Sequence, residues 1–168
     1  MTQKCQNTSY LRNFIFGVED SLVSTVGLLS GIAIAGVSKT TILITGIILI
    51  FVEAVSMAAG SFLSESSAEV YIKENKDTKR SILSSLIMFS SYFLSGFIVI
   101  FPYIIFQISD AFKISILLSL ISLFVLGIIG AKISKINIFK NGFKMAIVGG
   151  LAILVGTLAG NLLTQINY

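Results

Sequence analysis

Residues 12–31 read RNFIFGVEDSLVSTVGLLSG, and this stretch decides the fold of the chain. It belongs to an apolar segment, residues 14–37, that is long enough to cross a bilayer and yet carries Glu19 and Asp20 near its start. A carboxylate inside a membrane helix costs roughly 2.5–3.5 kcal/mol on insertion scales, so it needs a polar partner or a wet cavity and usually marks a functional site. Small or polar residues also recur at every third or fourth position and form a seam along one helix face: Gly17, Asp20, Ser24, Gly27 and Gly31.

The amino-acid composition is that of a membrane protein. Hydrophobic residues make up 55% of the 168-residue chain and charged residues only 12%, the mean hydropathy is +0.94, and soluble domains average about 25% charged residues. The single Cys and the lack of His exclude a disulfide framework and zinc sites built from Cys and His. The net charge of +4 is interpreted as loop charge that sets membrane topology, so no nucleic-acid partner is expected.

The hydropathy pattern predicts an all-α, polytopic membrane protein that forms a single transmembrane domain over residues 1–168. Each apolar segment is near the roughly 20 residues needed to cross about 30 Å of hydrocarbon. The five predicted spans cover about residues 14–37, 42–64, 82–106, 114–131 and 145–163, and a short cytoplasmic link covers residues 65–81.

The positions of lysine and arginine predict the orientation in the membrane. Ten of the twelve basic residues fall in the N-terminal segment and in the second and fourth connections, whereas the other side of the membrane has only Lys39 and Lys113. Because cytoplasmic loops carry the excess of basic residues, the N-terminus is predicted to be cytoplasmic and the C-terminus to lie outside.

The second predicted span repeats the pattern of the first. The residues that share one of its faces follow alternating steps of four and three: Gly46, Ile50, Glu53, Met57, Gly60 and Ser64. Consecutive spans run antiparallel, so Asp20 and Met57 are expected at a similar depth in the membrane. Glu53 is expected about one turn deeper, at the level of Ser24.

Two interpretations of these residues remain open. In the first, Asp20 and Glu53 are protonated or bonded to serines, and Met57 only fills space, as methionines in helices usually do. In the second, they line a cation path, because carboxylate oxygens with one soft thioether suit Fe²⁺ or Mn²⁺ better than Ca²⁺ or Mg²⁺. The acids would titrate as metal binds, which makes proton exchange a natural coupling. No basic residue lies inside either predicted span to neutralise them, which favours the cation path.

The number of available ligands points to a homodimer. One chain offers fewer such groups at one depth than the roughly six that a divalent ion commonly takes. A twofold dimer whose axis follows the seam would double the set, and glycines on the two faces would allow close approach. The glycines of this helix-packing seam are Gly17, Gly27, Gly31, Gly46 and Gly60.

Acidic residues also mark the predicted cytoplasmic mouth of the path. Glu65 and Glu69 are four residues apart and share one face at the end of the second span, and Glu19 lies near the cytoplasmic end of the first. We expect these residues to gather metal ions at the mouth. The alternative is a solvated, charged helix end.

Two motifs in these spans resemble those of the vacuolar iron transporter family. Residues 12–25, RNFIFGVEDSLVST, are similar to the family motif RDxIxGxxDGLVST, and residues 56–64, SMAAGSFLS, are similar to SMAxGEYxS. The resemblance implies a five-span homodimer with its translocation path at the dimer interface. It also implies export of Fe²⁺, and often Mn²⁺, from the cytosol in exchange for protons, with the family's intramembrane Asp and Met on Asp20 and Met57.

The chain departs from the family pattern at particular positions. Asn13 and Ser21 replace an Asp and a Gly of the first motif, and Ser61 replaces the Glu of the second. Glu53 lies where many members have a small residue, so we interpret it as a replacement for a lost carboxylate. Better-known members carry a long, Glu-rich helical insertion between the second and third spans. The short link over residues 65–81 therefore predicts a short form without this metal-collecting domain.

The sequence thus predicts an Fe²⁺ and/or Mn²⁺ transporter that exports metal by proton antiport through a path lined by the first two spans, in a prokaryotic cell membrane. Two alternatives stay open: a carrier of a different cation, and a non-conducting assembly or regulatory subunit that retains the fold. The sequence has no nucleophile–base pair and no cofactor motif, so neither an enzyme nor a resident cofactor is predicted. The expected partners are a second copy of the chain, the lipid bilayer, metal ions and protons.

Overall fold

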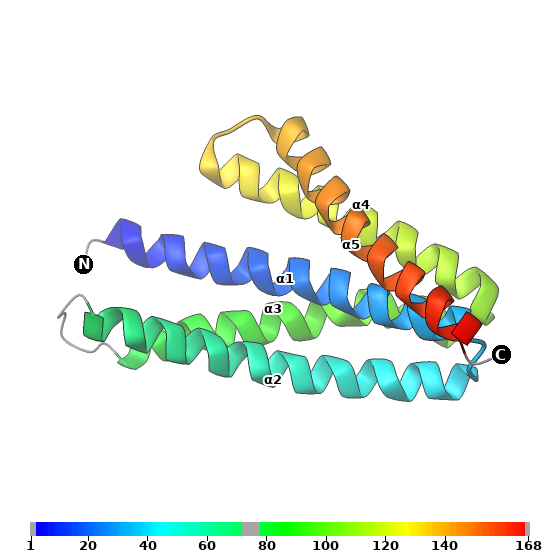
Figure 1. Ribbon diagram of the computed structural model, residues 1–168. Helices are drawn as coiled ribbons and strands as arrows, with labels where there is room; N and C mark the ends of the chain where they lie inside the picture. The colour runs from blue at the N-terminus through cyan, green and yellow to red at the C-terminus, as the bar shows by residue number, and fades with distance from the viewer. Residues whose placement is uncertain (1–2, 72–77, 167–168) are drawn as a thin grey trace.

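The structure, a computed structural model, describes residues 3–71 and 78–166, which form five long helices (Figure 1). No strand occurs in these two ranges. Each helix is long and apolar enough to cross a membrane, so the predicted all-α fold with five spans is confirmed. The helices are α1 (Gln3–Ile34), α2 (Lys39–Tyr71), α3 (Thr78–Ile105), α4 (Ile108–Ser134) and α5 (Ile138–Ile166).

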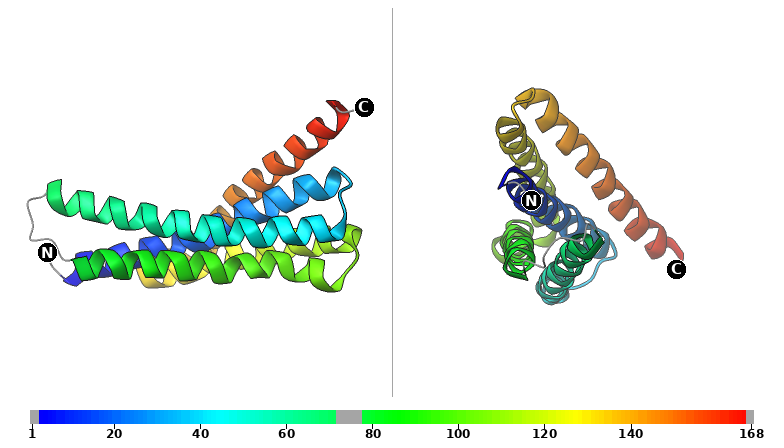
Figure 2. Two further views of the ribbon diagram at one scale, coloured as in Figure 1. Left: turned by 90° about the horizontal axis from the view of Figure 1, so that it is seen from below. Right: turned by 90° about the vertical axis from the view of Figure 1, so that its left-hand side faces the viewer.

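The helices form two groups that meet along α1. The first group is a bundle in which α1, α2 and α3 lie side by side, with α2 antiparallel to the other two. The second is the α4–α5 hairpin, which packs against α1. The turn that joins α4 to α5 lies away from the bundle (Figures 1 and 2). Helix α3 packs extensively on both α1 and α2, which contact each other less. This arrangement leaves space between α1 and α2.

The helices extend beyond the predicted spans. Helix α1 begins at Gln3, although residues up to Asn13 are too polar to have been counted in the first span, and α2 continues to Tyr71. Of the link predicted over residues 65–81, both ends are therefore helical, and residues 72–77 lie outside the described residues. Hydropathy marks where a chain crosses hydrocarbon, whereas a helix continues into water as long as its hydrogen bonds and side-chain contacts are satisfied.

Helix α3 contributes a central part of the core. Its Val99, Ile100 and Tyr103 are buried against apolar residues of α1 and α2 such as Leu29 and Ile50. It also buries a row of polar and sulfur-containing side chains that recur in steps of three and four: Ser81, Ser84, Met88, Ser91 and Ser95. This segment is covered on two sides by α1 and α2.

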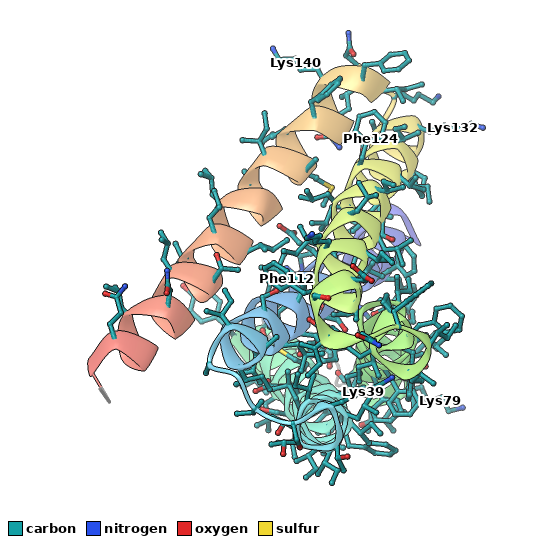
Figure 3. The ribbon with its side chains drawn as sticks, turned by 90° about the vertical axis from the view of Figure 1, so that its right-hand side faces the viewer. Lys39, Lys79, Phe112, Phe124, Lys132 and Lys140 are labelled. Carbon is teal, nitrogen blue, oxygen red and sulfur yellow. The ribbon has the colours of Figure 1, made fainter. Side chains whose placement is uncertain are left out.

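The connections lie at two opposite ends of the molecule. Lys132 and Lys140 project from the α4–α5 turn, clear of the α1–α3 bundle (Figure 3). At the other end, the Lys39 ammonium donates hydrogen bonds to the carbonyls of Ile104 (3.1 Å) and Phe106 (2.9 Å). These bonds tie the start of α2 to the end of α3.

The predicted glycine seam contacts other helices of the same chain. Gly17 faces Ser91 and Met88 of α3, and Gly46 faces Ile100 of α3. Gly27 and Gly31 of α1 lie against the α5 glycines at positions 156 and 160, so the backbones of α1 and α5 meet directly. A Cβ at Gly60, in contrast, would meet no atom within 4 Å. Close helix approach therefore occurs within one chain at four of the five positions.

Two substitutions at the same crossing of α1 and α5 should have opposite consequences. A Cβ on Gly156 would lie 2.8 Å from the Cα and 2.9 Å from the carbonyl oxygen of Gly27, whereas a Cβ on Gly27 would lie 4.0 Å from the nearest atom. Gly156→Ala should lower the free energy of unfolding by about 1–3 kcal/mol, because backbone atoms cannot move aside without separating the helices. Gly27→Ala should leave it unchanged or raise it by up to about 1 kcal/mol through helix propensity. Thermal unfolding followed by circular dichroism in detergent compares the two, and equal midpoints would contradict this packing.

Candidate functional site

Polar residues from three helices meet in the middle of the α1–α3 bundle. The Tyr92 hydroxyl of α3 lies 2.8 Å from the Ser24 hydroxyl of α1, and Ser24 donates to the backbone carbonyl of Asp20 at 2.6 Å. A serine hydroxyl has one hydrogen, so Tyr92 must be the donor in its bond to Ser24.

Two carboxylates belong to this cluster. Asp20 of α1 and Glu53 of α2 lie close enough for their charges to interact, and both charges reach the Tyr92 hydroxyl. The charges of Asp20 and Glu53 thus reach Tyr92 of α3, and Ser24 joins these residues through its hydrogen bond to Tyr92. We call these four residues the carboxylate cluster. Two interacting negative charges within a membrane-spanning bundle repel, so the cluster favours neutralisation by a cation or by protons.

A hydrogen bond fixes α3 at the level of the carboxylate cluster. Ser21, which stands where the resembling motif has glycine, donates to the backbone carbonyl of Tyr92 at 2.7 Å. Both residues are buried. This departure from the motif therefore gives a direct link between α1 and α3 next to the carboxylates.

A cavity of about 770 Å³ lies between α1 and α2, with α3 at one wall. Its α1 residues precede Asp20 in the chain, so the cavity lies on the N-terminal side of the carboxylate cluster along α1. Met57 and Glu19 are on its wall, whereas Asp20, Ser24 and Glu53 are not. The lining residues are Arg12, Asn13, Ile15, Phe16, Glu19, Ser56, Met57, Gly60, Ser61, Ser64 and Met88. The predicted site residues are thus divided between a cavity and an adjacent cluster.

The predicted mouth residues on α2 are buried in the bundle. Glu65 accepts a hydrogen bond from the Ser9 hydroxyl, and its two oxygens lie 3.1 Å from Arg12 Nη2 and 3.6 Å from Arg80 Nη2. Glu69 is also buried, and its Oε1 makes no hydrogen bond to the described residues. Neither side chain projects into solvent, so binding of metal by Glu65 would require its ion pairs to open.

Three residues of the site were not identified from the sequence. Arg12 lies just before the predicted first span, yet its largely exposed side chain is on the cavity wall. Tyr92 and Met88 come from the third span, in which no site residue was predicted because it contains no acidic residue. Met88 could have been identified from the row of serines on α3. These serines recur at helical spacing, as the small and polar residues of α1 and α2 do.

In residues 3–71 and 78–166 there is no group of three or more His, Cys, Asp or Glu side chains placed to hold one metal ion. Any ion at the carboxylate cluster would therefore need hydroxyl, thioether or carbonyl ligands, or groups from a second chain.

Five helices long and apolar enough to cross a membrane, two of which carry the interacting acids Asp20 and Glu53, define a polytopic membrane protein. The sequence profile of the VIT family matches residues 11–84 and 68–161, which together cover most of the chain. The chain belongs to this family, which is the vacuolar iron transporter family that its two motifs resemble, and it is thus a member of a family of membrane metal-ion transporters. No curated protein matches the chain.

Proposed function

We propose that this protein transports Fe²⁺ or Mn²⁺ out of the cytosol in exchange for protons. The observation that carries the proposal is the pair of carboxylates, Asp20 and Glu53, at interaction distance inside two membrane-spanning helices. Two negative charges in such a site are unfavourable unless a cation or protons neutralise them. A metal ion and protons are therefore alternative occupants, and this alternation is the physical basis of the exchange.

The available ligands suit a first-row divalent ion. Asp20 and Glu53 supply carboxylate oxygens, Ser24 and Tyr92 supply neutral oxygens beside them, and the Met57 thioether lies on the wall of the adjacent cavity. A mixed oxygen and sulfur set favours Fe²⁺ or Mn²⁺ over Mg²⁺ and Ca²⁺, which prefer oxygen alone.

The basic residues supply the proposed orientation of the chain in the membrane. The positive-inside rule places the N-terminus and the α4–α5 turn in the cytoplasm, and both are at the same end of the molecule (Figure 1). The cavity then receives ions from the cytosol before they reach Asp20. Glu19 on the cavity wall attracts them, and Glu65 and Glu69 contribute as gathering residues when the Glu65 ion pairs open. We place the protein in a prokaryotic cell membrane.

A homodimer is part of this proposal, because one chain supplies fewer ligands than the roughly six that a divalent ion commonly takes. Four of the five seam glycines are already in contact with helices of the same chain, so they are not free to contact a second copy. Gly60 is exposed and lies on the cavity wall. We therefore place the twofold contact along the α2 face around Gly60, where a second chain would cover the cavity.

The proposal is tested by metal uptake into inside-out proteoliposomes that contain a pH-sensitive dye. Fe²⁺, Mn²⁺, Mg²⁺ and Ca²⁺ are compared at equal concentration, with protein-free liposomes as the control. We expect entry of Fe²⁺ or Mn²⁺ together with proton movement in the opposite direction, and little entry of Mg²⁺ or Ca²⁺. Flux of another cation in place of Fe²⁺ and Mn²⁺ would support the changed-substrate alternative. No flux of any cation through well-folded protein would support the non-conducting subunit.

A further inference from the structure

The cavity beside the carboxylate cluster has methionines on two of its walls. Met57 comes from α2 and Met88 from α3, and both line the same space between α1 and α2. Met88 is only 3% exposed. A methionine from each of two different helices therefore borders the cavity.

The packing of α1 against α3 fixes the level of Met88. A Cβ at Gly17 would lie 3.2 Å from the Met88 sulfur and would overlap the Ser91 hydroxyl, so glycine at this position lets the sulfur lie against the α1 backbone. Gly17 is about one turn from Asn13 on the cavity wall and about one turn from Asp20. The Met88 sulfur thus lies between the cavity wall and the carboxylate cluster along α1.

The cavity wall also has polar groups that lack partners. Asn13 and Ser61 are 4% and 8% exposed, and Asn13 Nδ2 and Ser61 Oγ make no hydrogen bond to any described residue. Buried polar groups are nearly always hydrogen-bonded, so these two groups can serve as polar partners for whatever enters the cavity. Turning the Asn13 amide by half a turn would present its oxygen as a further neutral ligand.

The charges on the cavity wall nearly cancel. Glu19 and Arg12 are the charged residues among those that line it, and they have opposite signs. Divalent cations all carry the same charge, so the charges on the wall do not discriminate between them. The softness of its ligands remains as the property that can discriminate between them, because thioether sulfur binds soft ions better than hard ones.

We propose that Met57 and Met88 form a two-thioether site that selects softer divalent cations, Fe²⁺ over Mn²⁺ and Cd²⁺ most strongly, before the ion reaches Asp20 and Glu53. The selectivity for Fe²⁺ rests on the function proposed above, whereas binding of Cd²⁺ at the two sulfurs does not. Met88 is then a specificity-determining residue on a helix that carries no acidic ligand.

The test measures binding of Cd²⁺ and Mn²⁺ to the purified protein and to Met57→Leu and Met88→Leu, which nearly conserve side-chain volume. Met145→Leu is the matched control, because Met145 lies on the wall of a different pocket, between α1, α4 and α5. We expect each cavity variant to bind Cd²⁺ about tenfold more weakly, the size of effect typical for altered metal surroundings. Mn²⁺ affinity should change much less, and Met145→Leu should change neither affinity.

X-ray absorption at the cadmium edge should report two sulfur neighbours in the unmodified protein and one in each cavity variant.

The two proposals fail in different ways. An unchanged ratio of Cd²⁺ to Mn²⁺ affinity in folded Met88→Leu, or cadmium without sulfur neighbours in the unmodified protein, would overturn the thioether site and leave the transport proposal standing. Cadmium bound by two sulfurs in a protein that moves no cation through proteoliposomes would support the site and overturn the transport proposal.

Discussion

Asp20→Asn should reduce metal flux into proteoliposomes by at least about 100-fold, or about 2.7 kcal/mol at 1.36 kcal/mol per factor of ten. Asparagine keeps the size of the side chain, but it removes one of the two charges of the carboxylate cluster. Glu53 alone then attracts a divalent ion more weakly, and the cluster has one site fewer for an exchanging proton. The initial rate of Mn²⁺ uptake and the accompanying dye signal measure the two losses separately.

The matched control is Asp110→Asn. Asp110 is an exposed carboxylate in the first turn of α4, so this substitution removes the same charge far from the cluster. We expect it to transport at the rate of the unmodified protein. If Asp20→Asn also transports at that rate, the ion does not pass between Asp20 and Glu53, and the carboxylates would have a role in packing or assembly instead.

The fold and part of the site could be predicted because both depend on properties that one helix carries by itself. Five apolar segments of membrane length are visible in the hydropathy of the chain, and the structure has five helices that fit them. Helical periodicity identifies which residues share a face, and the antiparallel order of α1 and α2 sets their relative depth. These two rules predicted one path lined by Asp20, Ser24, Glu53 and Met57, whereas in the structure only Met57 of these four lies on the cavity wall.

The rest of the site depends on which helix covers which face, and periodicity does not contain that information. The glycine seam of α1 was predicted to contact a second chain. In the structure Gly17 faces α3, and Gly27 and Gly31 face α5. Tyr92 and Met88 became part of the site only because α3 packs against both α1 and α2. A tyrosine and a methionine in an apolar segment have many packing roles, so their sequence context alone does not distinguish ligands from core residues.

Glu65→Gln should lower the free energy of unfolding by about 3 kcal/mol or more, the cost expected when one partner of a buried ion pair is removed. The Glu65 and Arg80 side chains are both 6% exposed, and Glu65 also interacts with Ser9 and Arg12. A glutamine retains hydrogen-bonding atoms but removes the charge that both guanidinium groups face. Thermal unfolding in detergent measures the loss, and Glu19→Gln is the control, since Glu19 is in none of the ion pairs found among the described residues.

The same variant distinguishes the two roles considered for Glu65. If Glu65 holds α1, α2 and α3 together near the N-terminal end of α1, Glu65→Gln should melt at a lower temperature while the folded fraction binds Mn²⁺ nearly as the unmodified protein does. If Glu65 gathers metal, its ion pairs must open easily, so the stability loss should be small and Mn²⁺ affinity should fall. The three contacts to Glu65, two of them from cations, favour the first result, because a metal ion would have to displace both arginines from a carboxylate that is already buried.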